Sequence, residues 1–208
     1  MAIRAVIFDL GGVVFGSPLH AIAAYEVARD IAPGAINRVV VEASADGAWA
    51  RLERGELGLE TFYPAFEADC GGAGVEIDAR ELMQAVSEAT TPRPAMLTAI
   101  ARIRASGRQA AALTNNWVAE DGSMGVVREH FDVFIESAVE GMRKPDPRIF
   151  HLTCERLGVA PNEAAFLDDI GLNLKTARAL GMTTIKVVDA DSALAELEDV
   201  LGMPLREP

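Results

Sequence analysis

The chain has 208 residues, which suits one large domain or a domain with an insertion. Half of the residues are hydrophobic and 24% are charged, an ordinary globular balance that excludes a disordered or collagen-like chain. Against 19 Lys and Arg stand 31 Asp and Glu, a formal net charge of -12 with no basic run, so nucleic acid is not expected as a partner.

The first predicted strand covers residues 3–10, a short run rich in β-branched and aromatic side chains. It ends in Asp9, and Gly11 and Gly12 follow, which predicts a turn directly after a buried strand. Asp9 is therefore expected at the carboxyl end of that strand.

A helical insertion is predicted after this strand. Between Phe15 and about Thr91 the strand pattern disappears, and amphipathic stretches take its place at residues 19–31, 35–52, 60–68 and 78–89. We expect residues 16–91 to form a helical cap over a core made of residues 1–15 and 92–208, where it can cover a binding crevice. The glycine-rich residues 71–74 are expected to be a flexible connector.

Helices and strands alternate after the insertion. A helical stretch around residues 96–103 leads to a strand at 109–113, which is followed by Thr114 and Asn115. The next strand, 131–137, precedes a helix that Asp146 can cap and Gly158 can end. The remaining predicted elements are a strand at 164–167, a helix at 173–180, a strand at 183–188 and a last helix capped by Asp191.

This alternation is typical of parallel βαβ units. It predicts an α/β fold, a doubly wound, Rossmann-like parallel sheet with the helical cap inserted into it. In such sheets ligands bind beyond the carboxyl ends of the strands. The polar residues that follow the strands are Asp9, Thr114, Lys144, Asp168 and Asp169.

These side chains suit phosphoryl transfer. Asp9 can act as a nucleophile, Lys144 can neutralise developing charge, and Thr114 with the amides after it can hold phosphoryl oxygens. Magnesium prefers a site with one or two carboxylates, which Asp9 offers together with Asp168 or Asp169.

In sequence order these motifs resemble the haloacid dehalogenase superfamily of hydrolases. The motifs are FDLGGV at residues 8–13, LTN at 113–115, GMRKP at 141–145 and FLDD at 166–169. Within the superfamily the chain is most similar to the phosphatase domain at the N-terminus of bifunctional soluble epoxide hydrolases, through LTNNW, FIES, GMRKPDPRIF and FLDDIGLNLKTARALGM. The resemblance covers essentially the whole chain and is weakest in the cap.

The resemblance implies catalytic roles for residues of the first three motifs. Asp9 would be the aspartyl nucleophile, Thr114 and Asn115 would bind the phosphate group, and Lys144 would contact the phosphate and stabilise its charge. The implied activity is hydrolysis of a small phosphorylated substrate.

The resemblance also implies a Mg²⁺ ion. Its ligands would be Asp9, the main-chain carbonyl of Gly11 and one acidic residue of the fourth motif. Asp169 is favoured over Asp168, because related proteins have an acidic or amide residue four positions after the metal carboxylate, here Asn173. Asp168 would then support the site without binding the metal directly.

Gly11 departs from the pattern of the phosphatases in this superfamily. They usually have a second aspartate at this position, which acts as general acid and base. A carbonyl ligand survives the change, but general acid and base catalysis, typically worth about 10² to 10⁴ in rate, does not.

Three functions are therefore compatible with the sequence. The leading one is a Mg²⁺-dependent phosphomonoesterase. The second is a dehalogenase acting on carbon, which needs no metal and also lacks the second aspartate. The third is a non-catalytic domain that binds a phosphorylated metabolite or a partner protein.

The remaining candidates have simpler interpretations. The three histidines lie in separate segments without metal-ligand spacing, and Arg143 and Lys175 are interpreted mainly as solvated charges. Trp117 can either line the pocket or fill the core.

Two cysteines outside any C-x-x-C pair exclude a disulfide framework or zinc ribbon and favour a reducing cytoplasm. No apolar run suggests a membrane span or membrane partner. The sequence leaves the oligomeric state open.

Overall fold

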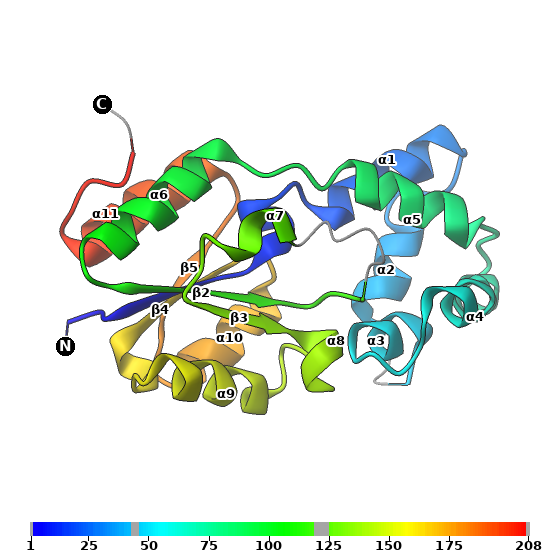
Figure 1. Cartoon of the computed structure of the whole chain (residues 1–208). Helices are drawn as coiled ribbons and strands as arrows, with labels where there is room; N and C mark the ends of the chain where they lie inside the picture. The colour runs from blue at the N-terminus through cyan, green and yellow to red at the C-terminus, as the bar shows by residue number, and fades with distance from the viewer. Residues whose placement is uncertain (1, 43–45, 119–124, 207–208) are drawn as a thin grey trace.

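The computed structural model describes residues 2–42, 46–118 and 125–206 (Figure 1). Its centre is a five-stranded sheet in the order β3-β2-β1-β4-β5, with every neighbouring pair parallel. The strands are β1 (Ala5–Phe8), β2 (Gln109–Thr114), β3 (Val133–Glu136), β4 (Ala164–Asp168) and β5 (Thr183–Lys186). The predicted α/β fold with a parallel sheet is confirmed, and the chain's first strand lies in the middle of the sheet.

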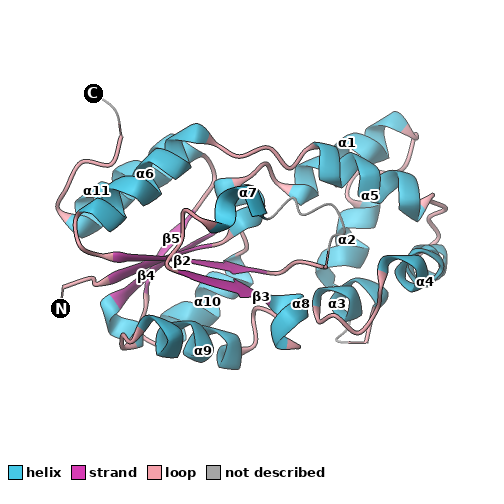
Figure 2. Ribbon diagram, viewed as in Figure 1, coloured by secondary structure: helices cyan, strands magenta, loops and turns pink. Residues whose placement is uncertain are grey.

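Helices cover both faces of the sheet (Figure 2). One face packs against α6 (Pro94–Ala105) and α11 (Ala190–Leu201), and the other against α9 (Pro147–Leu157) and α10 (Gly171–Ala179). The central strand shows why its sequence is apolar throughout: Val6 and Phe8 enter the first core, whereas Ala5 and Ile7 enter the second.

Short elements connect these layers. They are the turn η1 (Leu10–Val14) after β1, the helices α7 (Gly125–Arg128) and α8 (Ser137–Glu140), and a single helical turn, η2 (Pro161–Glu163). As predicted, Asp146 caps α9, since its carboxylate accepts a hydrogen bond from the Arg148 amide at 2.9 Å. Gly158 ends the same helix in the left-handed conformation.

Residues 16–91, which we call the cap segment, contain the helices α1 (Pro18–Ala28), α2 (Ala35–Glu42), α3 (Ala48–Glu53), α4 (Leu59–Gly72) and α5 (Ala79–Glu88). They lie beyond one end of the sheet (Figure 1) and share an apolar cluster of their own. The chain enters and leaves the segment side by side, where Phe15 pairs with Pro92. The division into core and cap domains stays a prediction.

In the described part of the chain, no helix combines the length and apolar character needed to cross a bilayer.

Three predictions about where helices begin, end or are capped are wrong. The stretch at 35–52 forms two helices, because a new helix starts after Gly47 where the Asp69 carboxylate accepts the Ala48 amide at 2.7 Å; residues 43–45 lie outside the described residues. The expected connector at 71–74 begins inside α4, which continues to Gly72. Asp189 caps α11 in place of Asp191, since its carboxylate accepts the Ser192 amide at 2.9 Å.

Buried carboxylates hold the cap segment together. Glu26 on α1 is only 1% exposed, and its carboxylate accepts the amides of Gly34, Ile36 and Asn37 at 2.6, 2.7 and 3.1 Å. These amides belong to the first turn of α2, whose donors would otherwise have no partner. Glu26 therefore joins two helices through one side chain.

We predict that Glu26→Ala lowers the free energy of unfolding by about 2–4 kcal/mol, because a buried donor without a partner costs about 1–3 kcal/mol. Glu26→Gln keeps one acceptor oxygen and should lose about half as much. Urea denaturation measures both, with the exposed Glu60→Ala as control. An Ala variant as stable as the wild type would contradict this role.

Candidate active site

Three carboxylates meet at the carboxyl edge of the sheet. Asp9 follows β1, and its amide donates to the carbonyl of Leu167 in the neighbouring strand β4 at 2.9 Å. Asp168 ends β4 and Asp169 comes next. Carboxylate oxygens of Asp9, Asp168 and Asp169 lie within 4.8 Å of one another. The structure thus brings together the acids of the first and fourth motifs.

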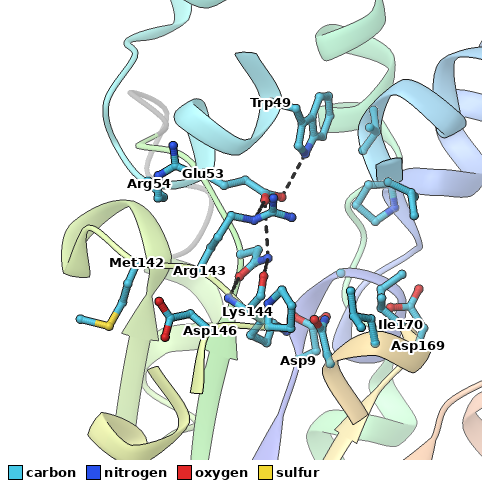
Figure 3. Close-up of a pocket in the computed structure, with 18 of the residues that line it drawn as sticks. Asp9, Trp49, Glu53, Arg54, Met142, Arg143, Lys144, Asp146, Asp169 and Ile170 are labelled. Carbon is cyan, nitrogen blue, oxygen red and sulfur yellow. Dashed lines mark hydrogen bonds and ion pairs between the residues drawn. The ribbon is translucent and has the colours of Figure 1, made fainter. Parts of the chain in front are cut away.

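Lys144 lies between two of these acids. Its side chain is 1% exposed, and its Nζ lies 2.8 Å from Asp9 Oδ1 and 2.8 Å from Asp168 Oδ2 (Figure 3). Burial opposes the charge of the ammonium, but Asp168 and Asp9 outweigh it and raise the pKa of Lys144 above its usual range. The lysine is therefore held in its charged form.

The two acids of the fourth motif have different surroundings. Asp168 is fully buried, and besides Lys144 it accepts the Ile170 amide at 2.7 Å and the Asn173 side-chain amide at 3.1 Å. Asp169 is half-buried and lines the cavity described below, with Ser17 Oγ 3.4 Å from its Oδ2. Asp169 thus has the more open carboxylate, as expected of the favoured metal ligand, although both assignments stay predictions.

The two glycines that follow the strand end at Asp9, Gly11 and Gly12, have different conformations and surroundings. Gly12 has a φ of 75°, and a Cβ there would collide with the Asp169 carboxylate. Gly11 has a φ of -62°, which any residue can adopt, but a Cβ would lie 3.1 and 3.2 Å from two ring carbons of Pro18. Arg93 fixes the turn by donating to the carbonyls of Gly12 and Val13 at 2.9 and 3.2 Å.

Asn115 contacts the main chain of Lys144. Its Oδ1 accepts the Lys144 amide at 2.8 Å, and its Nδ2 donates to the Lys144 carbonyl at 3.0 Å. The side chain predicted to bind phosphate therefore holds the lysine. Thr114 ends β2 and is 2% exposed, with its hydroxyl 3.4 Å from the Asn115 carbonyl. The phosphate-binding roles of both residues stay predictions.

A cavity of about 600 Å³ opens above the carboxylates, between the sheet edge and the cap segment. Asp9, Lys144 and Asp169 lie at its base (Figure 3), and Gly11 also lines it. Much of its wall is apolar: Pro18, Leu19, Val40, Val41, Trp49, Trp117, Met142, Ile170 and Leu172. Trp117 fits both interpretations, since it lines the pocket and also packs against the apolar cluster of the cap segment. None of the described histidines lines the cavity.

Sequence reasoning missed part of the wall. Glu53 and Trp49, both on α3, line the cavity, and Trp49 Nε1 donates to Glu53 Oε1 at 3.0 Å. Arg143, interpreted as a solvated charge, also lines the cavity and pairs with Glu53. Lys175 is exposed, as expected. The only signal for Glu53 was its spacing of four residues from Trp49, one helical turn, which does not point to a pocket by itself.

The charges at the base of the cavity favour a cation. Burial, with a further contribution from Asp168 and Asp169, raises the pKa of Asp9 well above its usual range although Lys144 acts in the opposite direction. Burial and then Asp168 raise the pKa of Asp169. Three carboxylates around one lysine leave an excess of negative charge that a divalent cation would offset. Oxygen donors of this kind fit Mg²⁺, with Asp9, Asp169 and the Gly11 carbonyl as its candidate ligands.

A parallel sheet whose central strand ends in a lysine-paired carboxylate, with more acids on the next strand, defines an α/β enzyme with its site at the sheet edge. The chain belongs to the haloacid dehalogenase-like hydrolase family, whose sequence model matches residues 3–181. The chain is thus a hydrolase of that family, as the motifs indicate.

Similar proteins cover nearly the whole chain. It is 41% identical to acyl-CoA dehydrogenase family member 10 of Mus musculus over 97% of its length, and 37% identical to bifunctional epoxide hydrolase 2 of Sus scrofa over 99%. It spans only 19% and 40% of those two relatives. Sesquiterpene phosphatase astK of Aspergillus oryzae is 25% identical, and the match covers 96% of this chain and 97% of that protein.

A solved structure shares the fold. It is a haloacid dehalogenase family enzyme of Bacteroides thetaiotaomicron in complex with magnesium and inorganic phosphate, with a TM-score of 0.64 and 20% identity. The match covers 93% of this chain and 99% of that one.

We predict that Asp169→Asn weakens Mg²⁺ binding by about 10-fold or more, and that Asp168→Asn weakens it less, because Asp168 is already occupied by Lys144 and Asn173. Isothermal titration with MgCl₂ measures both. Asp146→Asn, which removes an acid from the cavity wall away from the strand ends, is the control. A greater loss with Asp168→Asn would reverse the assignment.

Proposed function

We propose that this protein is a Mg²⁺-dependent phosphomonoesterase that acts on a small phosphorylated metabolite through an aspartyl-phosphate on Asp9. The observation that carries the proposal is the charged Lys144 held 2.8 Å from both Asp9 and Asp168 at the carboxyl edge of the sheet. A sesquiterpene phosphatase among the relatives supports it.

The reaction follows from the contacts of Asp9. Within the described chain, both polar contacts of its carboxylate use Oδ1, which binds Lys144 Nζ and the Leu10 amide, the latter at 2.7 Å. An oxygen of this carboxylate attacks phosphorus, and the bond from phosphorus to the ester oxygen breaks. Water then attacks the phosphoryl group, which releases inorganic phosphate and restores the carboxylate. Lys144 offsets the negative charge that gathers beside Asp9 during both steps.

A bound Mg²⁺ would supply charge neutralisation for the phosphoryl oxygens. Asp9, Asp169 and the carbonyl of Gly11 would hold it, with Asp168 as support. Thr114 and Asn115 would complete the phosphate site from the end of β2.

The cavity wall suggests the kind of alcohol that is released. About half of its apolar members come from the cap segment, where they would contact whatever extends from the phosphoryl group toward that segment. A sesquiterpene has an apolar hydrocarbon skeleton, so the sesquiterpene phosphatase among the relatives agrees with such a wall. We therefore favour a phosphate ester of an alcohol with apolar surface. A reducing cytoplasm is part of the proposal, because both cysteines are buried free thiols.

A dehalogenase would need no metal, and the excess of carboxylates at the strand ends favours the phosphatase over it. A domain that only binds ligands would not require a nucleophile paired with a charged lysine.

Asp9→Asn should abolish phosphate release while leaving the fold intact, because an amide is a far weaker nucleophile of nearly the same size. The measurement is hydrolysis of 4-nitrophenyl phosphate with Mg²⁺, alongside thermal unfolding. The exposed Asp191→Asn serves as control. Substantial turnover by a folded Asn variant free of wild-type protein would falsify the covalent role.

The absence of an acid at Gly11 should make the rate depend on the leaving group. Aryl and acyl phosphates should be cleaved much faster than alkyl esters, because the departing oxygen leaves without a donated proton. Gly11→Asp should rescue alkyl esters selectively, by up to about 10²-fold, if Pro18 yields the few tenths of an ångström that a Cβ needs.

The test compares kcat/KM against leaving-group pKa for the wild type, Gly11→Asp and Gly11→Ala. The Ala variant adds the same Cβ without an acid and so isolates the effect of crowding against Pro18. A wild-type rate independent of leaving-group pKa would mean that another residue donates the proton.

A further inference from the structure

Glu53 is a buried acid that the proposed reaction does not use. It ends helix α3 of the cap segment, is 7% exposed, and faces the cavity from the side opposite Asp9 (Figure 3). Placing a carboxylate in such a position is costly unless its oxygens find partners. The partners it has therefore indicate its role.

Both oxygens of Glu53 are engaged. Oε1 accepts the indole N–H of Trp49 at 3.0 Å, and Oε2 lies 2.6 Å from Nε of Arg143. Oε2 is also 3.5 Å from the side-chain amide of Asn115. Two of these three partners belong to the core, so Glu53 links the cap segment to the catalytic edge of the sheet.

The two core partners, Arg143 and Asn115, are each connected to Lys144. Arg143 precedes it directly in the chain, and Asn115 binds its main-chain amide and carbonyl. The main chain at Lys144 is thus held by the side chain of the preceding residue, Arg143, and by the side chain of Asn115. Neither contact reaches the ammonium group itself.

The backbones also approach closely at this junction. Gly55, two residues after Glu53, has a φ of 70°, and a Cβ there would collide with the carbonyl of Ala138 in α8. Ala138 lies shortly before the loop that carries Arg143 and Lys144. The end of α3 is therefore docked on the core at two adjacent points.

We propose that Glu53 is a positioning residue, which sets Lys144 between Asp9 and Asp168 by holding Arg143 and Asn115 when the cap segment is docked. The role rests on the proposed phosphatase function, since Lys144 is the group whose placement it controls. Burial raises the pKa of Glu53, and the neighbouring Arg143 charge partly offsets this rise.

The test measures kcat and KM for aryl phosphate hydrolysis in Glu53→Gln. This change removes the charge but keeps an oxygen for Trp49. A misplaced lysine stabilises the transition state less, so kcat should fall about 10–100-fold with little change in KM. Glu53→Asp keeps the charge but withdraws it from Arg143, and it should lose less. Glu60→Gln, which breaks an exposed ion pair with Arg80 in the same segment, should match the wild type.

A double-mutant cycle with Arg143→Met separates positioning from independent roles. Once Arg143 has lost its charge, Glu53→Gln should cost less in kcat than it does in the wild type, because one of the two links from Glu53 to Lys144 is already broken. The two tryptophans of the chain, Trp49 and Trp117, both line the cavity, so their fluorescence shows whether the cap segment stays docked in each variant.

Several results would overturn the proposal. A rise in KM at constant kcat would mean that Glu53 binds substrate, and a loss that grows with leaving-group pKa would make it a proton donor. Multiplicative effects in the cycle, or unchanged kinetics with only a lower Tm, would equally contradict it. A wild type that hydrolyses no aryl phosphate contradicts the proposed function instead, which keeps the two failures distinct.

Discussion

The site depends on a single buried ammonium. Lys144 is almost completely removed from water and shared between Asp9 and Asp168, which end or follow adjacent parallel strands. A charge in this position is tolerable only when its partners are close and well oriented. The arrangement fixes the carboxylate of Asp9, keeps the lysine charged, and leaves the third acid, Asp169, open to the cavity.

The rest of the fold serves to hold this group of charges. The parallel register of β1 and β4 brings Asp9 beside Asp168, and Gly12 lets Asp169 lie directly against the turn after β1. Arg93 fastens that turn at the point where the chain returns from the cap segment. The carboxyl edge of the sheet is thus held by the strands themselves and by the two segments through which the chain enters and leaves the cap segment.

Sequence patterns were sufficient to locate the candidate site residues that stand at the carboxyl ends of strands. A buried parallel strand is apolar throughout, so the first polar residue marks its carboxyl end, and this rule located Asp9 and Asp168. It could not predict what a side chain contacts after the strand ends. The contacts of Asn115 with the main chain of Lys144 are an example, while the phosphate-binding role that the resemblance implies for Asn115 stays a prediction.

Sequence patterns could not predict the contacts between the cap segment and the core. Glu53 and Arg143 are far apart in sequence, and only the docking of α3 beside α8 makes them a pair. The helix break near residue 47 escaped prediction for a similar reason, since the cap for α3 comes from Asp69 on another helix. Both features depend on partners that are distant in sequence, which a local pattern does not reveal.

The central claim is that Asp9 becomes phosphorylated during turnover. Quenching the reaction in acid within the first turnover, followed by peptide mass spectrometry, tests it most directly. The account predicts the mass of one phosphoryl group on the peptide that contains Asp9, formed and lost at rates compatible with phosphate release. Turnover without that modification, or with the phosphoryl group on another residue, would contradict it.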